Sequence, residues 1–316
     1  MKIEKVVIFG AGTMGYGLAL AFAQGGLSVY LVDKSEAILR KAERLIRSSL
    51  LTLQSAGTIT KGAPREIAQR IKTFVRTDEI PQDIPLVVEA IDEKEIAKKR
   101  LFQHIDQRFS PETIIASNTS YLNVFELAEI RNIDRLIITH WFSPPYILPV
   151  VEVVRGPRTS KATVDQVEGL LREMGKEPII VGKYIPGFIV NRLQRAIGKE
   201  IFHLIDNEII SPQDLDRAVK YSLGIRIPVI GVVQRYDYAG LDFTLMAQKN
   251  DFISKEFNEK PSRTLEAMVD AGHLGIKSGK GFYDYGGKPK EAILRTRDTR
   301  LLKMTRFMKQ LDVQDK

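Results

Sequence analysis

The first fifteen residues constrain the fold of this chain more than any other stretch. A short apolar run, Val6–Phe9, passes directly into glycines spaced as G-x-G-x-x-G, and an apolar segment of helix length follows. The candidate phosphate-contacting residues of this loop are Gly10, Gly12, Thr13, Met14 and Gly15. A strand, a glycine loop and a helix in this order present free backbone N–H groups to a pyrophosphate. The spacing predicts a dinucleotide-binding βαβ unit, although in isolation it also occurs in plain turns.

A second strand is expected over Ser28–Val32, and it ends at Asp33. An acidic residue about 20 positions after the glycines is the usual partner of a ribose 2′-hydroxyl. Asp33 is also placed to cap a helix that starts near Ser35, and the two roles are compatible. Because a carboxylate repels a 2′-phosphate, NAD is the expected cofactor, with neighbouring Lys34 as a minor argument for NADP.

Short apolar runs alternate with helix-like segments as far as residue 181, which predicts an α/β fold. The other expected strands are Ile71–Val75, Leu86–Val88, Thr113–Ala116, Leu136–Thr139, Val150–Val154 and Pro178–Val181. We expect a Rossmann-type doubly wound parallel sheet with every strand ending at one edge. From Phe188 the pattern is helical, so the predicted domains are 1–183, an NAD-binding sheet domain, and 184–316, an all-α domain.

Composition excludes several classes of function. The 316 residues include no cysteine, which rules out disulfides, thiolate metal sites and a cysteine nucleophile. No metal-ligand cluster, signal-peptide layout or membrane-spanning apolar stretch is visible, and a cytoplasmic protein is expected. The net charge of +8 fits a solvated basic surface or the attraction of an anionic cofactor and substrate. Nucleic-acid binding is not favoured, because the basic residues are scattered.

His140 is the candidate base among four histidines, because it ends a predicted strand at the cofactor edge. Oxidation of an alcohol by NAD needs a base, and a histidine base works best when a carboxylate holds its second nitrogen. Glu152 lies in an otherwise apolar strand, where a lone charge is costly unless paired, so His140 is its natural partner. The alternative is that Glu152 faces solvent on an edge strand. His104 and His203 are expected to be structural or surface residues, and His273 is ambiguous.

Hydrogen-bonding side chains for the reacting oxygen are expected near the same edge. Ser120 and Asn118 follow the preceding strand, and Asn191 lies near the start of the first helix of the second domain. The alternatives are a helix N-cap for Ser120 and an ordinary polar helix position for Asn191.

Six motifs occur in order along the chain: GAGTMG at 10–15, VVEAIDE at 87–93, SNTS at 117–120, THWFSPPYILPVVEVV at 139–154, PGFIVNRL at 186–193 and GIKSGKGFYDY at 275–285. In these motifs the chain resembles the L-3-hydroxyacyl-CoA dehydrogenase family. This resemblance implies catalytic positions at Ser120, His140, Glu152 and Asn191. It implies nucleotide contacts at Glu93, Lys98 and Asn118, and a homodimer formed through the helical domain.

The chain departs from the CoA-specific members of that family. Ser143 replaces the usual asparagine, Pro149 replaces a lysine, the stretch 51–56 lacks the basic run, and Gly231-Val232 replaces a Gly-Pro turn. Two of these changes remove cations that would meet the CoA nucleotide. The segments around 55–62 and 144–149 look more like relatives acting on free acids, namely L-gulonate, carnitine and pyridine-carboxylate dehydrogenases.

The sequence therefore predicts an NAD-dependent dehydrogenase that oxidises the 3-hydroxy group of a short 3-hydroxyacyl-CoA to the 3-oxo compound. The same chemistry on a free hydroxy acid is a close alternative. A non-catalytic NAD-binding structural protein is a third possibility, because a fold does not fix a function. The four candidate catalytic residues argue against that last one.

Overall fold

The computed structural model describes residues 3–250 and 261–314. It divides into two compact units, Met1–Ile197 and Gly198–Lys316. The predicted domain boundary at residues 183 and 184 precedes helix α7 (Val190–Asp206), within which the two units meet in sequence. The domain limits that the sequence suggested remain a prediction, and residues 1–2, 251–260 and 315–316 lie outside the described part of the chain.

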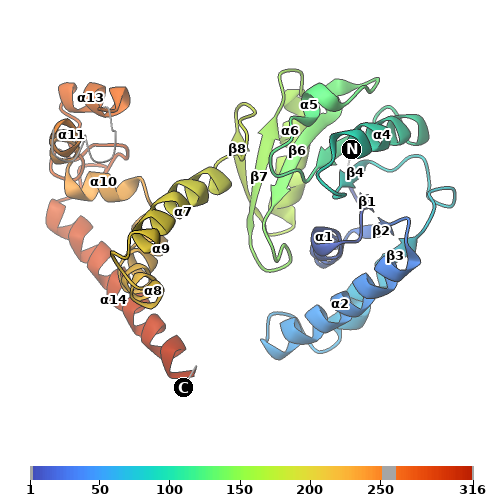
Figure 1. Ribbon diagram of the computed structural model, residues 1–316, viewed down its shortest axis with the longest axis horizontal. Coiled ribbons are helices and arrows are strands. Elements are labelled where there is room, and N and C mark those ends of the chain that lie inside the picture. The colour runs from blue at the N-terminus through green and yellow to red at the C-terminus, as the bar shows by residue number, and fades with distance from the viewer. Residues whose placement is uncertain (1–2, 251–260, 315–316) are drawn as a thin grey trace. The chain divides into compact units, whose positions relative to one another are not determined.

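The first unit is built on one eight-stranded sheet (Figure 1). Its strands are β1 (Lys5–Phe9), β2 (Ser28–Val32), β3 (Ile71–Phe74), β4 (Leu86–Glu89), β5 (Ile114–Ser117), β6 (Leu136–Trp141), β7 (Val150–Arg155) and β8 (Glu177–Val181). Their order across the sheet is β3-β2-β1-β4-β5-β6-β7-β8. The order turns back on itself between β1 and β4, and this switch point is where ligands bind in open α/β sheets. The predicted Rossmann-type sheet is therefore confirmed.

The direction of the last two strands corrects one expectation. The strands from β3 to β6 in the sheet order run parallel to one another, whereas β7 is antiparallel to β6, and β8 is parallel to β7. The expectation that every strand ends at the same edge is therefore wrong for β7 and β8. A parallel neighbour needs a crossover, usually a helix, but no helix lies between Trp141 and Val150, so the chain simply turns back.

Helices cover both faces of this sheet (Figure 1). They are α1 (Thr13–Gln24), α2 (Glu36–Ser55), α3 (Ala63–Gln69), α4 (Glu95–Arg108), α5 (Val124–Leu127), the 3₁₀ turn η1 (Ile133–Arg135) and α6 (Lys161–Glu173). Apolar residues of α1, α2 and α6 form one buried cluster with alternate strand residues such as Val6 and Ile8. Those of α4 and α5 form another with the intervening residues such as Val7 and Phe9. Both faces of the central strands are thus buried, which is why their sequences are continuously apolar.

Local interactions determine where helices α1 and α2 end and begin. The side chain of Ser35 accepts a hydrogen bond from the Ile38 N–H at the start of α2, as an N-cap does. At the end of α1, Gly26 has a φ of +92°, a backbone conformation that favours glycine after a helix.

In the described residues of the second unit the regular secondary structure is helical, apart from isolated β-bridges in the segment Gly275–Asp284. After α7 its helices are α8 (Pro212–Tyr221), α9 (Leu223–Ile230), α10 (Gln234–Ala239), α11 (Leu241–Lys249), α13 (Arg263–Asp270) and α14 (Lys290–Gln314). Ser211 caps α8 by accepting the Asp214 N–H, with Pro212 in the first helical position. The predicted all-α character of this part is confirmed.

Candidate active site

The three glycines of the loop after β1 occupy different environments. Gly10 has a φ of +96°, and a Cβ added there would lie 2.5 Å from the Ala90 carbonyl oxygen. A Cβ on Gly15 would lie 1.7 Å from the Gly10 carbonyl oxygen, whereas a Cβ on Gly12 would meet nothing within 4 Å. Gly10 and Gly15 are thus required by the turn and by packing, and Gly12 borders open space at the N-terminus of α1. This is the arrangement that a pyrophosphate needs to approach the backbone, so the loop fits NAD.

Asp33 ties the end of β2 to that loop. Its Oδ2 accepts the Ala11 N–H at 3.0 Å, and its Oδ1 accepts the Ser35 N–H at 3.0 Å. Because Ser35 is the N-cap of α2, the alternative that Asp33 caps this helix is wrong. The carboxylate is half-buried beside the glycine loop, where a ribose hydroxyl is expected.

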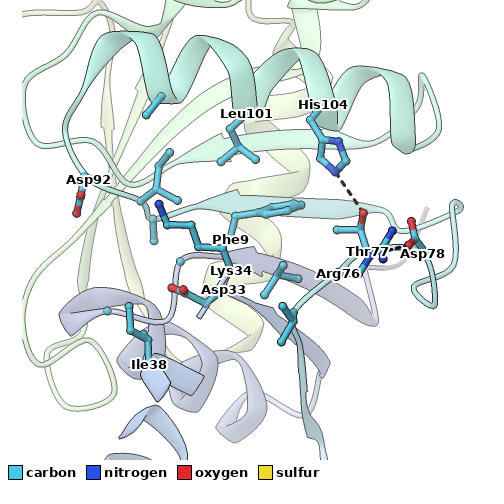
Figure 2. Close-up of a pocket in the computed structure, with 17 residues that line it drawn as sticks. Phe9, Asp33, Lys34, Ile38, Arg76, Thr77, Asp78, Asp92, Leu101 and His104 are labelled. Carbon is cyan, nitrogen blue, oxygen red and sulfur yellow. Dashed lines mark hydrogen bonds and ion pairs between the residues drawn. The ribbon is translucent and has the colours of Figure 1, made fainter. Parts of the chain in front are cut away.

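A cavity of about 610 Å³ opens beside the loop at the switch point of the sheet. Figure 2 shows its walls, which come from the ends of β1 and β2, the segment after β3, and helix α4. Its lining includes Gly10, Gly12, Asp33, Ile91 and Leu101. Its position next to the glycine loop and Asp33 suits the adenosine half of the cofactor.

His140 and Glu152 are directly opposite each other on β6 and β7. The His140 Nδ1 lies 2.7 Å from the Glu152 Oε2, and both side chains are almost completely buried. The antiparallel turn that the sequence did not predict is what creates this pairing, since cross-strand neighbours on one face lie within reach. Glu152 is 1% exposed and β7 is flanked by β6 and β8, so the solvent-facing alternative is wrong.

The second carboxylate oxygen of Glu152 holds the start of α7. Its Oε1 accepts the Ile189 N–H at 2.9 Å and the Val190 N–H at 2.8 Å. Burial alone would raise the pKa of the Glu152 carboxyl, but the hydrogen bonds from His140, Val190 and Ile189 lower that pKa below its ordinary value. Glu152 is therefore a buried carboxylate whose charge is compensated by donors on both sides.

Aromatic rings enclose the histidine. The ring centroid of Phe142 lies 4.7 Å from that of His140, and the ring centroid of Phe188 lies 5.2 Å away. Because Glu152 engages Nδ1, Nε2 is the ring nitrogen that can exchange a proton with a substrate. This is the geometry of a histidine base oriented by a carboxylate.

Asn118 and Ser120 follow β5, the strand next to β6 in the sheet. The Ser120 N–H donates to Glu93, whose carboxylate also accepts the Thr119 hydroxyl at 2.9 Å. Helix α5 has Asn123 as its N-cap, so the helix-cap alternative for Ser120 is wrong. The Asn118 Oδ1 accepts the Trp141 N–H at 3.0 Å, which braces the strand residue after His140.

Asn191 is the second residue of α7, next to Val190. Among the described residues no hydrogen bond joins it to His140 or Ser120. Glu152 fixes the backbone just before Asn191, so the same carboxylate that orients the histidine also positions the helix that carries the amide.

Lys98 is buried and pairs with two glutamates. Its ammonium is 2.5 Å from the Glu89 Oε1 and 3.3 Å from the Glu93 Oε2, and its side chain is 1% exposed. Glu89, fully buried at the end of β4, also accepts the Ser117 hydroxyl at 2.5 Å. Lys98 thereby holds Glu93 in place beside Ser120. The roles of Glu93 and Lys98 toward a nucleotide remain predictions.

Glu89 was not singled out from the sequence, although its position carries the same signal as that of Glu152. Both are single carboxylates in otherwise apolar strands, and such a charge is tolerated only with partners. Lys176 was not singled out either; its ammonium donates to the Pro145 carbonyl at 2.7 Å and to the Leu148 carbonyl at 3.1 Å. Burial lowers the pKa of Lys176 below its ordinary value.

The segment 143–149 that follows Phe142 is fixed against two helices. The Ser49 hydroxyl of α2 donates to the Tyr146 hydroxyl at 3.0 Å. A Cβ on Gly17 of α1 would lie 2.7 Å from the Pro145 ring, so the proline packs directly on that helix. The segment that connects His140 to Glu152 is therefore held in place by contacts with α1 and α2.

In the second unit, the motif GIKSGKGFYDY surrounds a buried acid. The Asp237 carboxylate accepts the Phe282 N–H at 2.8 Å, the Tyr283 N–H at 2.9 Å and the Tyr285 hydroxyl at 3.0 Å. Burial and the hydrogen bond to Asp237 raise the pKa of Tyr285. This arrangement accounts for the motif as a structural device of the second unit.

Across residues 3–250 and 261–314, no group of three or more histidine or acidic side chains could hold a metal ion. No helix in the same ranges has the length and hydrophobicity to span a bilayer.

Together, the sheet, the glycine loop and the histidine–carboxylate pair define a dinucleotide-dependent oxidoreductase. Residues 5–184 match the model of the 3-hydroxyacyl-CoA dehydrogenase NAD-binding domain, and residues 187–285 match that of the C-terminal domain of the same enzymes. The chain belongs to the 3-hydroxyacyl-CoA dehydrogenase family. It is therefore an NAD-dependent oxidoreductase acting on CH–OH groups.

The names of the relatives indicate more than one substrate. The chain is 31% identical to 5-formyl-3-hydroxy-2-methylpyridine 4-carboxylate 5-dehydrogenase of Mesorhizobium japonicum, over 97% of this chain and 98% of that protein. It is 32% identical to a probable 3-hydroxybutyryl-CoA dehydrogenase of Bacillus subtilis, over 91% of this chain and 99% of that protein. The crystal structure of the 3-hydroxyacyl-CoA dehydrogenase from Archaeoglobus fulgidus superposes with a TM-score of 0.79, at 31% identity over 96% of this chain and 99% of that chain.

Proposed function

We propose that this enzyme reversibly oxidises the 3-hydroxy group of a short 3-hydroxyacyl-CoA, such as 3-hydroxybutyryl-CoA, to the 3-oxo compound. The observation that carries the proposal is the buried pair of His140 and Glu152, joined at 2.7 Å at the end of β6. Membership in a family of 3-hydroxyacyl-CoA dehydrogenases supports the substrate class.

In this proposal His140 is the general base in oxidation and the general acid in reduction. Its Nε2 takes the hydroxyl proton as the hydride leaves the carbinol carbon, and NAD, when bound, supplies the hydride acceptor. Glu152 keeps the other nitrogen protonated and stabilises the imidazolium that forms. The Ser120 hydroxyl and the Asn191 amide hydrogen-bond the reacting oxygen. Gly10, Gly12, Gly15 and Asp33 hold the dinucleotide.

A second candidate is the same reaction on a small hydroxy acid that carries no CoA. Two features favour it: Pro149 and the uncharged stretch 51–56 lack the cations that would meet a CoA nucleotide. The bond between Tyr146 and Ser49 adds a third, since it closes segment 143–149 onto α2. The pyridine-carboxylate dehydrogenase of Mesorhizobium japonicum is, by its name, a relative that acts on such a compound.

A substrate screen distinguishes the two candidates. NADH formation is measured with 3-hydroxybutyryl-CoA, free 3-hydroxybutyrate, L-gulonate and carnitine. We expect kcat/KM for the CoA thioester to exceed that of each free acid by about tenfold or more, because a bound carrier contributes binding energy to the transition state. Reaction with free acids alone would reject the CoA proposal and support the second candidate. NAD binding with no hydride transfer from any substrate would instead support a non-catalytic role.

We also propose that the enzyme is a cytoplasmic homodimer. The second unit exposes many large apolar side chains in this single chain, among them Phe202, Phe243 and Met246. A molar mass in light scattering of about twice the 35.7 kDa of one chain is expected, and a mass of one chain would reject the dimer.

A further inference from the structure

The cavity beside the glycine loop extends beyond the residues that the motif accounts for. Gly10 and Gly12 border the pyrophosphate position, and Asp33 marks the adjoining ribose. The cavity continues past Asp33 to Thr77 and His104 (Figure 2). With the pyrophosphate at the glycines and the ribose at Asp33, the base of a bound NAD would lie toward the far end of the cavity.

The side walls of this part of the cavity are apolar, whereas polar side chains lie where it ends. Phe9, Val32, Val75 and Leu101 line the sides, which suits the flat faces of a purine. Thr77 and His104 supply polar atoms beyond them. A purine buried between apolar walls presents its polar edge to whatever lies at the end of the cavity.

His104 is held in this position from two directions. Its Nε2 lies 3.2 Å from the Thr77 hydroxyl, and its ring meets the Phe9 ring edge-on at a centroid distance of 6.1 Å. Figure 2 shows the imidazole of α4 directed toward Thr77 in the segment after β3. Thr77 is buried, but His104 is exposed, so the Thr77 bond leaves the other edge of the imidazole accessible.

The bond between His104 and Thr77 is not what fixes the segment after β3. Arg108, one turn further along α4, donates to the Thr77 carbonyl at 2.8 Å and to the Ile80 carbonyl. Because this guanidinium anchors the backbone independently, loss of the imidazole is not expected to release the segment. His104 is therefore available for a role other than structure.

We propose that His104, oriented by Thr77, is a specificity-determining residue that hydrogen-bonds the polar edge of the adenine base of NAD. This assigns a binding role to a histidine that the sequence pattern classed as structural or surface. The role concerns cofactor binding only, so it holds whichever substrate the enzyme oxidises.

Calorimetry with ADP-ribose tests the proposal, because this ligand contains the adenosine half of NAD but no nicotinamide and requires no turnover. His104→Ala should weaken ADP-ribose binding about fivefold or more, the effect of losing a hydrogen bond to a ligand. The variant should also lose discrimination between NAD and its hypoxanthine analogue, in which a carbonyl oxygen replaces the adenine amino group. Binding of nicotinamide mononucleotide should stay within about twofold of the parent enzyme.

Three controls make the result decisive. His203→Ala changes an exposed histidine of α7 and should alter none of the affinities. Gly12→Val fills the space beside the helix N-terminus and should weaken ADP-ribose and NAD alike. Thr77→Val keeps the shape of the side chain but removes the partner of the imidazole. It should weaken ADP-ribose less than His104→Ala does and should add little in the double variant.

ADP-ribose affinity of His104→Ala within about twofold of the parent, at unchanged Tm, would overturn the proposal. Equal weakening of ADP-ribose and nicotinamide mononucleotide together with a lower Tm would also overturn it, since that is the signature of a structural residue. If His104→Ala does not fold, Thr77→Val decides through the discrimination between NAD and the hypoxanthine analogue, and unchanged discrimination rejects the proposal.

Discussion

His140→Asn is expected to lower kcat by about 10²–10⁴-fold, the usual contribution of a general base. The asparagine amide occupies roughly the place of the imidazole Nδ1, so it can still donate to the Glu152 Oε2 that accepts from His140 at 2.7 Å. It offers no nitrogen equivalent to Nε2. The substitution therefore removes the proton acceptor without leaving the Glu152 carboxylate unpaired.

Steady-state kinetics with saturating NAD, together with calorimetric affinity for NAD, checks this result. The affinity should remain within about twofold of the parent, because His140 lies at the end of β6 and does not line the cavity beside the glycine loop. His203→Asn, an exposed histidine on α7, serves as the matched control. Turnover above about a tenth of the parent rate in His140→Asn would remove His140 from the mechanism.

The first half of the fold was predictable because local signals agree with the global pattern there. The apolar β1, the three glycines and Asp33 form one βαβ unit, and each residue has a single physical requirement that its sequence position reveals. The predicted strands all occur, within one or two residues of their expected ends.

The direction of β7 was not predicted because strand direction depends on the connection and not on the strand. The run Val150–Val154 is as apolar as the parallel strands, so its composition gave no hint. The absence of a helical pattern in segment 142–149 was the available signal, because a short connection without a helix joins antiparallel neighbours. The same reversal places Glu152 opposite His140, so the one error in topology concerns the feature on which the site depends.

The buried charged residues show a second limit of prediction from the sequence. Glu89 and Asp237 are both fully buried, yet neither was singled out from the sequence. The partners of Asp237 come from residues about 45 positions later in the chain, and only the fold reveals them. Lys98 is a further case: its ion pairs with Glu89 and Glu93 were not predicted, and its role toward the nucleotide, which the resemblance implies, stays a prediction.

Glu152→Gln is expected to lower kcat by about 10²–10⁴-fold although the side chain keeps its size. In the parent enzyme one oxygen of Glu152 accepts two backbone N–H groups, from Ile189 and Val190, and the other accepts the His140 Nδ1–H. Glutamine has only one oxygen, so its NH₂ must face one of these donors.

If the amide oxygen of the introduced glutamine faces Ile189 and Val190, its NH₂ donates to the His140 Nδ1. The imidazole proton must then lie on Nε2, and the nitrogen that should accept the substrate proton is already protonated. If the amide is reversed, its NH₂ opposes two N–H donors at the start of α7, which destabilises the helix that carries Asn191. Either orientation impairs catalysis, one through the tautomer and the other through position. An unchanged kcat would show that Glu152 does not set the tautomer.

The stability of Glu152→Gln should depend on pH in a defined direction. The pKa of Glu152 is lowered in the folded chain, so its ionised form contributes to the free energy of unfolding above the ordinary carboxyl pKa of about 4.3. That contribution is lost as the pH falls through the lowered pKa, and glutamine never has it. Denaturant unfolding should therefore give a large difference between parent and variant near neutral pH and a smaller one below about pH 4.

Glu129→Gln is the matched control: the pKa of Glu129 is lowered by its hydrogen bond to Lys99, but its side chain is exposed. The loss of that surface pair should leave both kcat and stability nearly unchanged. A stability difference for Glu152→Gln that is independent of pH would show that the ionised carboxylate is not what holds His140 and α7 together.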